Sequence, residues 1–183
     1  KRDSRVDLVS RYGQPLGLRG GGQFVGFGLF DADRRGGHLR EADVPWAYAT
    51  DSNYFTIHAQ RILSGRHFAR TDSLEAALAM VVELSHAAAL WGSADAVGRR
   101  VRLGGADGPL AEVVGVVTDR KEPTFSGNHL VLTGRRQIYL SRWQLVDGQP
   151  RVSVRATSDA NDAIAALADA GASVDPSIEV LYW

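Results

Sequence analysis

The sequence predicts an α+β fold, in which a ferredoxin-like sandwich of two βαβ units carries a strand-rich insertion. Residues 44–68 and 151–183 each follow a pattern of strand, helix and strand. Residues 74–148 between them are rich in strand and turn signals. Two such units form a four-stranded sheet with both helices on one face. A chain of 183 residues, 44% hydrophobic and 23% charged, suits one globular domain with an insertion.

The first forty or so residues are expected to be mostly irregular, because glycines at positions 20–22 and 36–37 punctuate them as turns. Between these glycines, the apolar run at residues 23–30 is typical of a strand. We expect this run to pair in antiparallel fashion with a second strand at residues 44–50.

The first strand–helix–strand unit begins with this second strand. Asp51 or Ser52 can cap its helix by accepting the free amide hydrogens of the first turn. Tyr54, Ile57 and His58 then share one helix face, and residues 62–68 form an extended exit. Five aromatic residues in this unit are expected in the core, with a partner-contact surface as the alternative: Trp46, Tyr48, Tyr54, Phe55 and Phe68.

The second unit begins with residues 151–156, whose alternating polar and apolar side chains are typical of a half-buried strand. Ser158 or Asp159 can cap the helix that follows, and Gly171 is expected to end it. The apolar stripe of this helix is expected at Ala160, Ile164, Leu167 and Ala168. The apolar run 178–183 is expected to form the returning strand.

The insertion contains a hairpin signal, because two apolar runs at 101–103 and 112–117 flank the glycine-rich turn 104–108. Residues 130–132 and 137–140 are further strand candidates. The stretch 73–91 permits two interpretations. Helix propensity favours one long helix, whereas the β-branched pair Val81-Val82 allows a strand with a helix starting at Ser85.

Composition excludes several classes of protein. The 21 basic residues balance 21 acidic ones, so no basic excess is present for binding nucleic acid through its phosphates. The chain has no cysteine, which excludes disulfides, thiolate metal sites and cysteine nucleophiles. No apolar run approaches the roughly 20 residues of a membrane-spanning helix. Because the chain starts at Lys1 and stops directly after an apolar run, we expect a segment excised from a longer protein; the alternative is a chain with disordered tails.

The motifs of catalytic and metal sites are missing. The histidines do not fall at the spacings H-x-x-x-H or H-x-H that place two imidazoles on one face; they are His38, His58, His67, His86 and His129. No G-x-S-x-G motif presents a nucleophilic serine, and the neighbours Ser85 and His86 point about 100° apart on a helix. Neither phosphate-binding glycine motif is complete. We therefore predict no catalytic, cofactor-binding or metal-binding residue and no cofactor.

Two basic clusters lie at residues 99–102 and 134–136. Because Asp95, Asp107 and Glu112 lie nearby in the sequence, we interpret these clusters as solvated strand faces. Contact with a partner or with a lipid headgroup is the alternative.

Six short patterns resemble the MacB-like periplasmic core domain of ABC transporter permeases. They are N-Y-F at 53–55, L-S-G-R-H-F at 63–68 with Asp72, L-W-G at 90–92 leading to V-G-R-R-V-R-L at 97–103, V-V-G-V-V-T-D at 113–119, I-Y-L at 138–140 and V-S-V-R at 152–155. Each is short, but their order and spacing match the family over residues 44–183. Ala96 and Ser141 stand where the family usually has proline.

The resemblance implies a porter-like subdomain made of residues 1–73 and 149–183, and an inserted Sabre-like subdomain at 74–148. It also favours a strand at 79–84 and a helix at 85–90 over a single long helix. Domains of this family lie on the periplasmic or extracytoplasmic side of the cell membrane, between two membrane helices.

The resemblance further implies the function of an extracytoplasmic permease domain that relays ATP-driven motion of the membrane helices to substrate export or mechanotransmission, without catalysis of its own. The implied partners are an ABC ATPase subunit or domain, a second permease copy and a periplasmic adaptor or lipoprotein, but no nucleic acid. Two alternatives stay open. One is a free-standing soluble ligand-binding α/β domain, and the other is a hydrolase, for which His86 and Asp119 are the best candidates.

Overall fold

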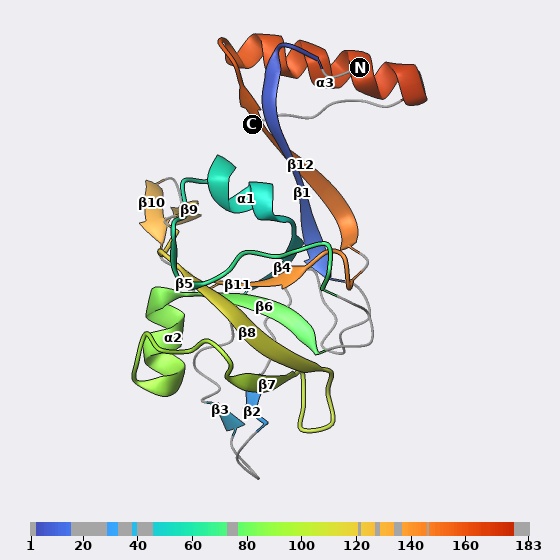
Figure 1. Cartoon of the computed structure of the whole chain (residues 1–183). Coiled ribbons are helices and arrows are strands. Elements are labelled where there is room, and N and C mark those ends of the chain that lie inside the picture. Colours follow the sequence, from blue (N-terminus) through green and yellow to red (C-terminus); the bar gives the residue numbers. More distant parts are fainter. Residues whose placement is uncertain are drawn as a thin grey trace.

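The computed structural model describes residues 3–15, 29–32, 38–39, 46–72, 77–120, 122–126, 129–133, 137–145 and 147–177. Within these ranges a ten-stranded mixed sheet dominates, and the helices α1 (Ser52–Ile57), α2 (Leu84–Trp91) and α3 (Ala160–Val174) pack around it (Figure 1). The predicted α+β class is confirmed. No described helix has the length and apolar character needed to cross a membrane.

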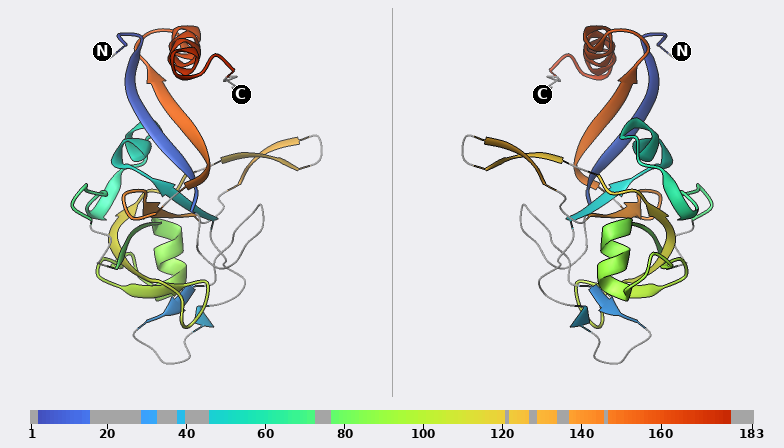
Figure 2. Two further views of the ribbon diagram at one scale, coloured as in Figure 1. Left: turned by 90° about the vertical axis from the view of Figure 1, so that its right-hand side faces the viewer. Right: turned by 90° about the vertical axis from the view of Figure 1, so that its left-hand side faces the viewer.

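The sheet follows the order β12-β1-β4-β11-β6-β8-β7-β2-β3, and β5 pairs with the end of β8. Its strands are β1 (Val6–Pro15), β2 (Leu29–Asp31), β3 (His38–Leu39), β4 (Trp46–Thr50), β5 (Ile62–Gly65), β6 (Leu78–Glu83), β7 (Arg100–Leu103), β8 (Leu110–Val117), β11 (Gln137–Ser141) and β12 (Asp147–Ala156). β4 runs parallel to β11 and β6 parallel to β8, whereas the other pairs are antiparallel. β9 (Glu122–Ser126) and β10 (His129–Thr133) form a separate hairpin that projects from the body (Figure 2).

β6 and β11 lie at the centre and are buried on both faces. Met80 and Val82 belong to one apolar cluster, while Ala79 and Val81, which alternate with them, belong to the other. Because successive side chains of a strand point to opposite faces, the sheet separates two cores. The first contains residues of α2, and the second contains the buried residues of α1.

The elements of the first predicted unit are confirmed as β4, α1 and β5. Asp51 is the N-cap of α1 and accepts a hydrogen bond from the backbone of Asn53. The helix ends at Ile57 with His58 as its C-cap. Ala59, the next residue, adopts a left-handed φ of 53°, and the amide of Gln60 donates to the carbonyl of Phe55 at 2.8 Å. β4 and β5 are not neighbours in the sheet, however, because β5 pairs with β8.

The expectation for the N-terminal region is wrong in two respects. β1 is a ten-residue strand in a region expected to be irregular, although Val6, Leu8, Ser10 and Tyr12 do follow a period of two. Residues 29–31 pair with β3 and β7, whereas β4 pairs with β1 and β11. Within the described residues the predicted antiparallel pair is therefore not formed; residues 23–28 of the predicted strand lie outside the described ranges.

The elements of the insertion follow the prediction closely. β7 and β8 form the predicted hairpin, and β10 and β11 cover the other two strand candidates. The ambiguous stretch is a strand, β6, followed directly by α2, so the single long helix is wrong. A helix there would leave β11 and β8 without the strand that pairs with both.

The second unit begins as predicted with β12, and Asp159 caps α3 by accepting from the backbone of Asn161. The helix does not end at Gly171 but continues to Val174. Of the predicted stripe, Ile164 and Leu167 are half-buried, whereas Ala160 and Ala168 are exposed. The buried residues of the helix are Ala163 and Ala166. The predicted returning strand, 178–183, lies outside the described residues.

Candidate functional site

A densely connected, buried polar group lies where β6 meets α2. Glu83, the last residue of β6, is only 1% exposed. Its Oε1 accepts hydrogen bonds from the Gln60 amide at 3.3 Å, the Arg120 backbone at 3.0 Å and the Tyr139 hydroxyl at 3.1 Å. Its Oε2 accepts from the backbone of Gln137 at 3.2 Å. One carboxylate thus joins the segment after α1, the segment after β8 and strand β11.

Burial controls the charge of this carboxylate. Loss of hydration raises the pKa of Glu83 to about 7, and the nearby negative charge of Asp119 adds to the effect. The hydrogen bonds from Arg120, Tyr139 and Gln137 act in the opposite direction because they stabilise the charged form. Burial likewise raises the pKa of the Tyr139 hydroxyl, which keeps this group a hydrogen-bond donor.

An aromatic cluster connects this carboxylate to α1. Tyr54 and Phe55, both fully buried, lie 5.6 Å and 5.1 Å from the ring of Tyr139. The guanidinium of Arg120 donates a hydrogen bond to the hydroxyl of Tyr54, while its backbone binds Glu83. The core role predicted for Tyr54, Phe55 and Phe68 is confirmed, Tyr48 is half-buried, and the Trp46 side chain lies outside what the structure describes.

Asp51 joins α1 to the ribbon formed by β1 and β12. Its Oδ1 accepts from the Ser10 hydroxyl at 2.9 Å as well as from the helix, and its Oδ2 lies 3.6 Å from the guanidinium of Arg142. Asn53, two residues further, donates from its side-chain amide to the carbonyl of Val9 at 2.9 Å. The helix start is therefore fastened to β1 through side chains of both elements.

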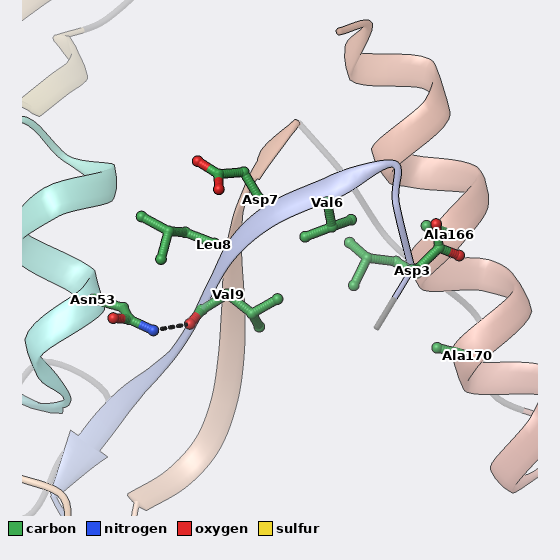
Figure 3. Close-up of a pocket in the computed structure, with 9 residues that line it drawn as sticks. Asp3, Val6, Asp7, Leu8, Val9, Asn53, Ala166 and Ala170 are labelled. Atoms are coloured by element: carbon green, nitrogen blue, oxygen red, sulfur yellow. Dashed lines mark hydrogen bonds between the residues drawn. The ribbon is translucent and has the colours of Figure 1, made fainter. Parts of the chain in front are cut away.

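An open apolar groove of about 550 Å³ lies between β1 and α3 (Figure 3). Its walls are mainly apolar, and the carboxylates of Asp3 and Asp7 lie at its rim; the full lining is Asp3, Val6, Asp7, Leu8, Val9, Asn53, Ala166, Leu167 and Ala170. Both of these carboxylates are already occupied by arginines, at 2.7 Å from Arg5 and 2.6 Å from Arg155. The groove suits contact with apolar groups, and no pair of free titratable groups converges in it.

The motif residues after β5 shape a loop and are not a reactive site. Arg66 binds Asp72 through two N–O contacts of 2.7 Å and 3.4 Å, and Asp72 also accepts from the backbone of Ala69 at 2.9 Å. Phe68 packs at 5.8 Å from Phe55 in the core. The pattern L-S-G-R-H-F with its following aspartate is thus explained by chain geometry.

Ser85, His86 and Asp119 do not converge into a hydrolytic triad. Ser85 is exposed and His86 fully buried, which agrees with the expectation that helix neighbours point apart. Asp119 accepts the backbone N–H of Ser85 at 2.9 Å and so caps α2, whose own N-cap Glu83 makes no capping hydrogen bond. Neither ring nitrogen of His86 has a hydrogen-bond partner among the described residues, and burial lowers the pKa of its imidazole to about 4.

One serine–histidine pair appears that sequence reasoning did not find. His58 Nε2 lies 3.1 Å from the hydroxyl of Ser153, 95 residues further along the chain. Burial, together with the charge of Arg120, lowers the pKa of His58 to about 4, which makes its imidazole a poor general base near neutral pH. We interpret the pair as a link between α1 and β12.

The other candidates from the sequence stay apart. Arg99, just before β7, and Arg100, its first residue, are exposed, as expected for a solvated face. Arg102 is half-buried and donates to the carbonyl of Gly108 at 3.0 Å, and residues 134–136 lie outside the described ranges. Among the described residues no group of three or more histidines and carboxylates could hold a metal ion. The side chains of His38 and His129 are not described.

Sequence reasoning also missed the Glu83 network. Its one local signal is a carboxylate at the end of the otherwise apolar run 78–84, which is unusual because a buried strand rarely carries a charge. Gln60 and Gln137, which complete the network, carry no such signal.

A comparison with protein families identifies the family of this chain, and solved structures share its fold. A family model described as the MacB-like periplasmic core domain matches residues 23–179. No curated protein sequence matches the chain. Among solved structures, the chain resembles the periplasmic region of MacB from Actinobacillus actinomycetemcomitans, with a TM-score of 0.61 and 14% identity over 94% of this chain and 69% of that one.

Two further structures share the fold. A domain of a permease protein from Porphyromonas gingivalis aligns with a TM-score of 0.58 and 13% identity, covering 96% of this chain and 71% of that one. The extracellular domain of the ABC-type transporter YknZ from Gram-positive bacteria aligns with a TM-score of 0.54 and 19% identity, covering 91% and 76%.

Proposed function

Because the chain belongs to the family of MacB-like periplasmic core domains of ABC transporter permeases, we propose that it relays motion of the membrane helices to a substrate or partner outside the cytoplasm. It acts as a mechanical element and carries no catalysis of its own. The observation that carries this proposal is the long ribbon of β1 and β12, which connects the end of the domain at α3 to β4, the neighbour of the central strand β11 (Figure 1).

The ribbon has the form of a lever. β1 pairs with β12 from Val6 to Pro15, a span of about 30 Å at the usual rise per strand residue. At its inner part, Tyr12 and Gly13 pair with β4. Two strands joined by a hydrogen-bond ladder move together, so a displacement applied at the α3 end is delivered to β4 and to the Asp51 cap that follows it.

From Asp51 the motion can pass through α1 to the second part of the domain. Tyr54 of α1 contacts Tyr139 of β11, and Gln60 after α1 binds Glu83 of β6. We propose the division into a porter-like part (residues 1–73 and 149–183) and a Sabre-like insertion (74–148). The Glu83 network is then the junction between the parts, since it joins residues from both.

The cellular setting is proposed on the same grounds. The full-length permease lies in the cell membrane with this domain on the extracytoplasmic side. Its partners are an ABC ATPase subunit or domain that acts through the membrane helices, a second permease copy, and an adaptor or lipoprotein. Nucleic acid is not among them, because the chain has no excess of basic residues.

Spin-label distances in the full-length permease, assembled with its ATPase in lipid nanodiscs, test the relay. The domain has no cysteine, so two labels can be attached at introduced cysteines. One is Val174→Cys on α3, where Val174 is 82% exposed, and the other is Asp107→Cys in the exposed turn between β7 and β8. We expect the distance between these labels to change when the ATPase is trapped with ATP.

The matched control pairs Val174→Cys with Val152→Cys, which is 50% exposed and lies in the middle of β12, within the same ribbon. This distance is expected to stay constant, because both labels belong to the ribbon and its helix. An unchanged distance between residues 174 and 107 during ATP turnover would contradict the relay.

The groove of Figure 3 favours a second candidate function, a ligand-binding domain for small apolar molecules. It is weaker, because such a site usually encloses its ligand, whereas Val9 on its wall is 48% exposed. Saturable binding of a hydrophobic dye that is lost in Ala166→Trp would support it, and no saturation would exclude it.

A further inference from the structure

Trp143 is an exposed indole on a rigid turn. It lies in the turn that follows β11, and it is 38% exposed. Both neighbours anchor the turn: the Arg142 backbone donates to the carbonyl of Thr50 at 3.0 Å, and the buried side chain of Gln144 accepts from the backbone of Ala79 at 2.8 Å. The indole is thus held in position before any partner arrives, which lowers the entropy cost of binding.

Two guanidinium groups lie against this one ring. The Cζ atoms of Arg70 and Arg142 are 4.7 Å and 5.2 Å from the ring centroid, within the range of cation–π attraction. The two arginines come from distant parts of the chain, one from the loop after β5 and the other from the turn itself. The fold therefore gathers two like charges at a single exposed aromatic side chain.

Only one of these charges is balanced by a carboxylate. Arg142 lies 3.6 Å from Asp51, and both side chains are largely buried. Arg70 is exposed and makes no ion pair with any residue that the structure describes. The surface formed by Arg70, Arg142 and Trp143, here termed the Arg–Trp surface, thus has an open cation beside an apolar ring.

We propose that the Arg–Trp surface docks a segment of a protein partner that carries a carboxylate next to an apolar side chain. The planar guanidinium of Arg70 binds a carboxylate through two parallel hydrogen bonds. The neighbouring apolar side chain then covers the indole of Trp143. Tryptophan and arginine are the residue types most enriched among the energetic centres of protein interfaces.

The chemistry favours a protein segment over a lipid surface. Recognition of anionic membranes uses clusters of about four to eight basic residues, whereas this surface has two, one of them already paired with Asp51. The whole chain has no net charge that would draw it to such a membrane. A single carboxylate beside an apolar group matches the size of the surface.

Binding of a labelled peptide to the 183-residue chain tests the proposal. The probe is a fluorescent ten-residue peptide of alternating glutamate and leucine, and its counterpart replaces each glutamate with glutamine. We expect the acidic peptide to bind in fluorescence anisotropy and the glutamine peptide to bind about tenfold more weakly or not at all. Arg70→Ala and Trp143→Ala are each expected to weaken binding by about tenfold.

The controls separate the surface from general charge effects. Arg61→Ala removes another exposed arginine and is expected to bind like the wild type. Arg70→Lys keeps the charge but not the planar fork, so we expect an intermediate loss. Because Trp143 and Arg70 are exposed, we expect their variants to fold like the wild type. Unchanged midpoints of thermal unfolding would verify this.

Three results would overturn the proposal. The first is that the acidic peptide does not bind. The second is that neither Arg70→Ala nor Trp143→Ala weakens peptide binding. The third is that the peptide does not bind but the wild type binds vesicles of phosphatidylcholine with one quarter phosphatidylglycerol, and the two variants lose this vesicle binding. The last result would assign the surface to a membrane. Because the assay needs neither ATPase nor lipid helices, its failure is independent of the relay proposed above.

Discussion

Gly65 and Gly115 face each other across the antiparallel pair of β5 and β8, and neither position has room for a side chain. A Cβ atom on Gly65 would overlap the carbonyl oxygen of Val114, and one on Gly115 would overlap the carbonyl oxygen of Arg66. Gly65 also adopts a left-handed φ of 73°. Two motifs separated by fifty residues thus owe their glycines to one close approach of two strands.

Gly65→Ala is expected to lower the free energy of unfolding by about 3 kcal/mol or more, because left-handed strain adds to the overlap with backbone atoms. Gly92→Ala is the matched control: Gly92 has a φ of 68°, but nothing lies within 4 Å of its Cβ position. It is expected to lose only about 1 kcal/mol. Urea unfolding measures both variants. Equal losses of the free energy of unfolding in Gly65→Ala and Gly92→Ala would contradict the close approach of β5 and β8 at Gly65.

Glu83→Gln is expected to change how stability depends on pH. The carboxyl has a pKa of about 7 in the folded chain and 4.5 as its ordinary value, so the folded state retains a proton that the unfolded state releases between these values. The protonated Glu83 carboxyl therefore contributes about 3 kcal/mol to the free energy of unfolding. This contribution is complete below pH 4.5 and is lost as the pH rises through 7.

Urea unfolding of the wild type and Glu83→Gln at pH 5 and pH 8 measures this effect. We expect stability to fall more steeply towards pH 8 in the wild type than in the variant. Glu112→Gln, at an exposed position of β8, serves as the control and should follow the wild type. Parallel pH profiles for wild type and Glu83→Gln would show that the buried carboxyl does not titrate in this window.

His86→Leu is expected to stabilise the domain by about 1–3 kcal/mol near pH 7, because it removes a buried imidazole with two unpaired nitrogens. The gain should increase in acid. The pKa of His86 is lowered to about 4 in the folded chain from 6.5, so in acid the unfolded chain binds a proton that the folded chain does not. The wild type therefore loses stability as the pH falls from 6.5 through 4, and the variant does not share this loss. A variant less stable than the wild type at pH 5 would refute this.

Asp51→Ala is expected to lower stability by about 2–3 kcal/mol, since it removes both the cap of α1 and the bond to Ser10. Asp159→Ala removes only the exposed cap of α3 and should cost about 1 kcal/mol. Hydrogen exchange should increase in α1 and in β1 for the first variant, and in α3 alone for the second. If both variants lose the same stability, and hydrogen exchange increases only in the helix that each substitution caps, Asp51 does not hold α1 to the ribbon of β1 and β12.

Ala59→Gly is expected to stabilise the domain by about 0.5–1 kcal/mol. Ala59 has a φ of 53° at the end of α1, where glycine avoids the steric cost of the left-handed region. The gain is reduced by the greater freedom of glycine in the unfolded chain. Thermal unfolding measures the effect, and a lower midpoint than the wild type would contradict it.

The sequence predicted the elements whose causes are local. The caps at Asp51 and Asp159 follow from side chains that reach amides two residues away. The hairpin of β7 and β8 follows from the glycine-rich turn between two apolar runs. The errors are local as well: Gly171 lies inside α3, where its carbonyl accepts a hydrogen bond from the backbone of Asp175 at 2.9 Å.

The missed features depend on contacts across long stretches of chain. β1 has a period of two, yet it becomes a strand by pairing with β12, more than 130 residues later. Glu83 is an ordinary carboxylate in the sequence, and only its position between Gln60, Arg120 and Tyr139 raises its pKa. No local pattern encodes those distances.

Chain chemistry alone therefore set the α+β class, the positions of most helices and strands, and the resemblance to one family of permease domains. Tertiary structure decided which strands pair, why two motif glycines cannot carry side chains, and where charge is buried. The physical reason is that propensity, capping and turns act over a few residues, whereas strand register and desolvation depend on partners that the fold brings together.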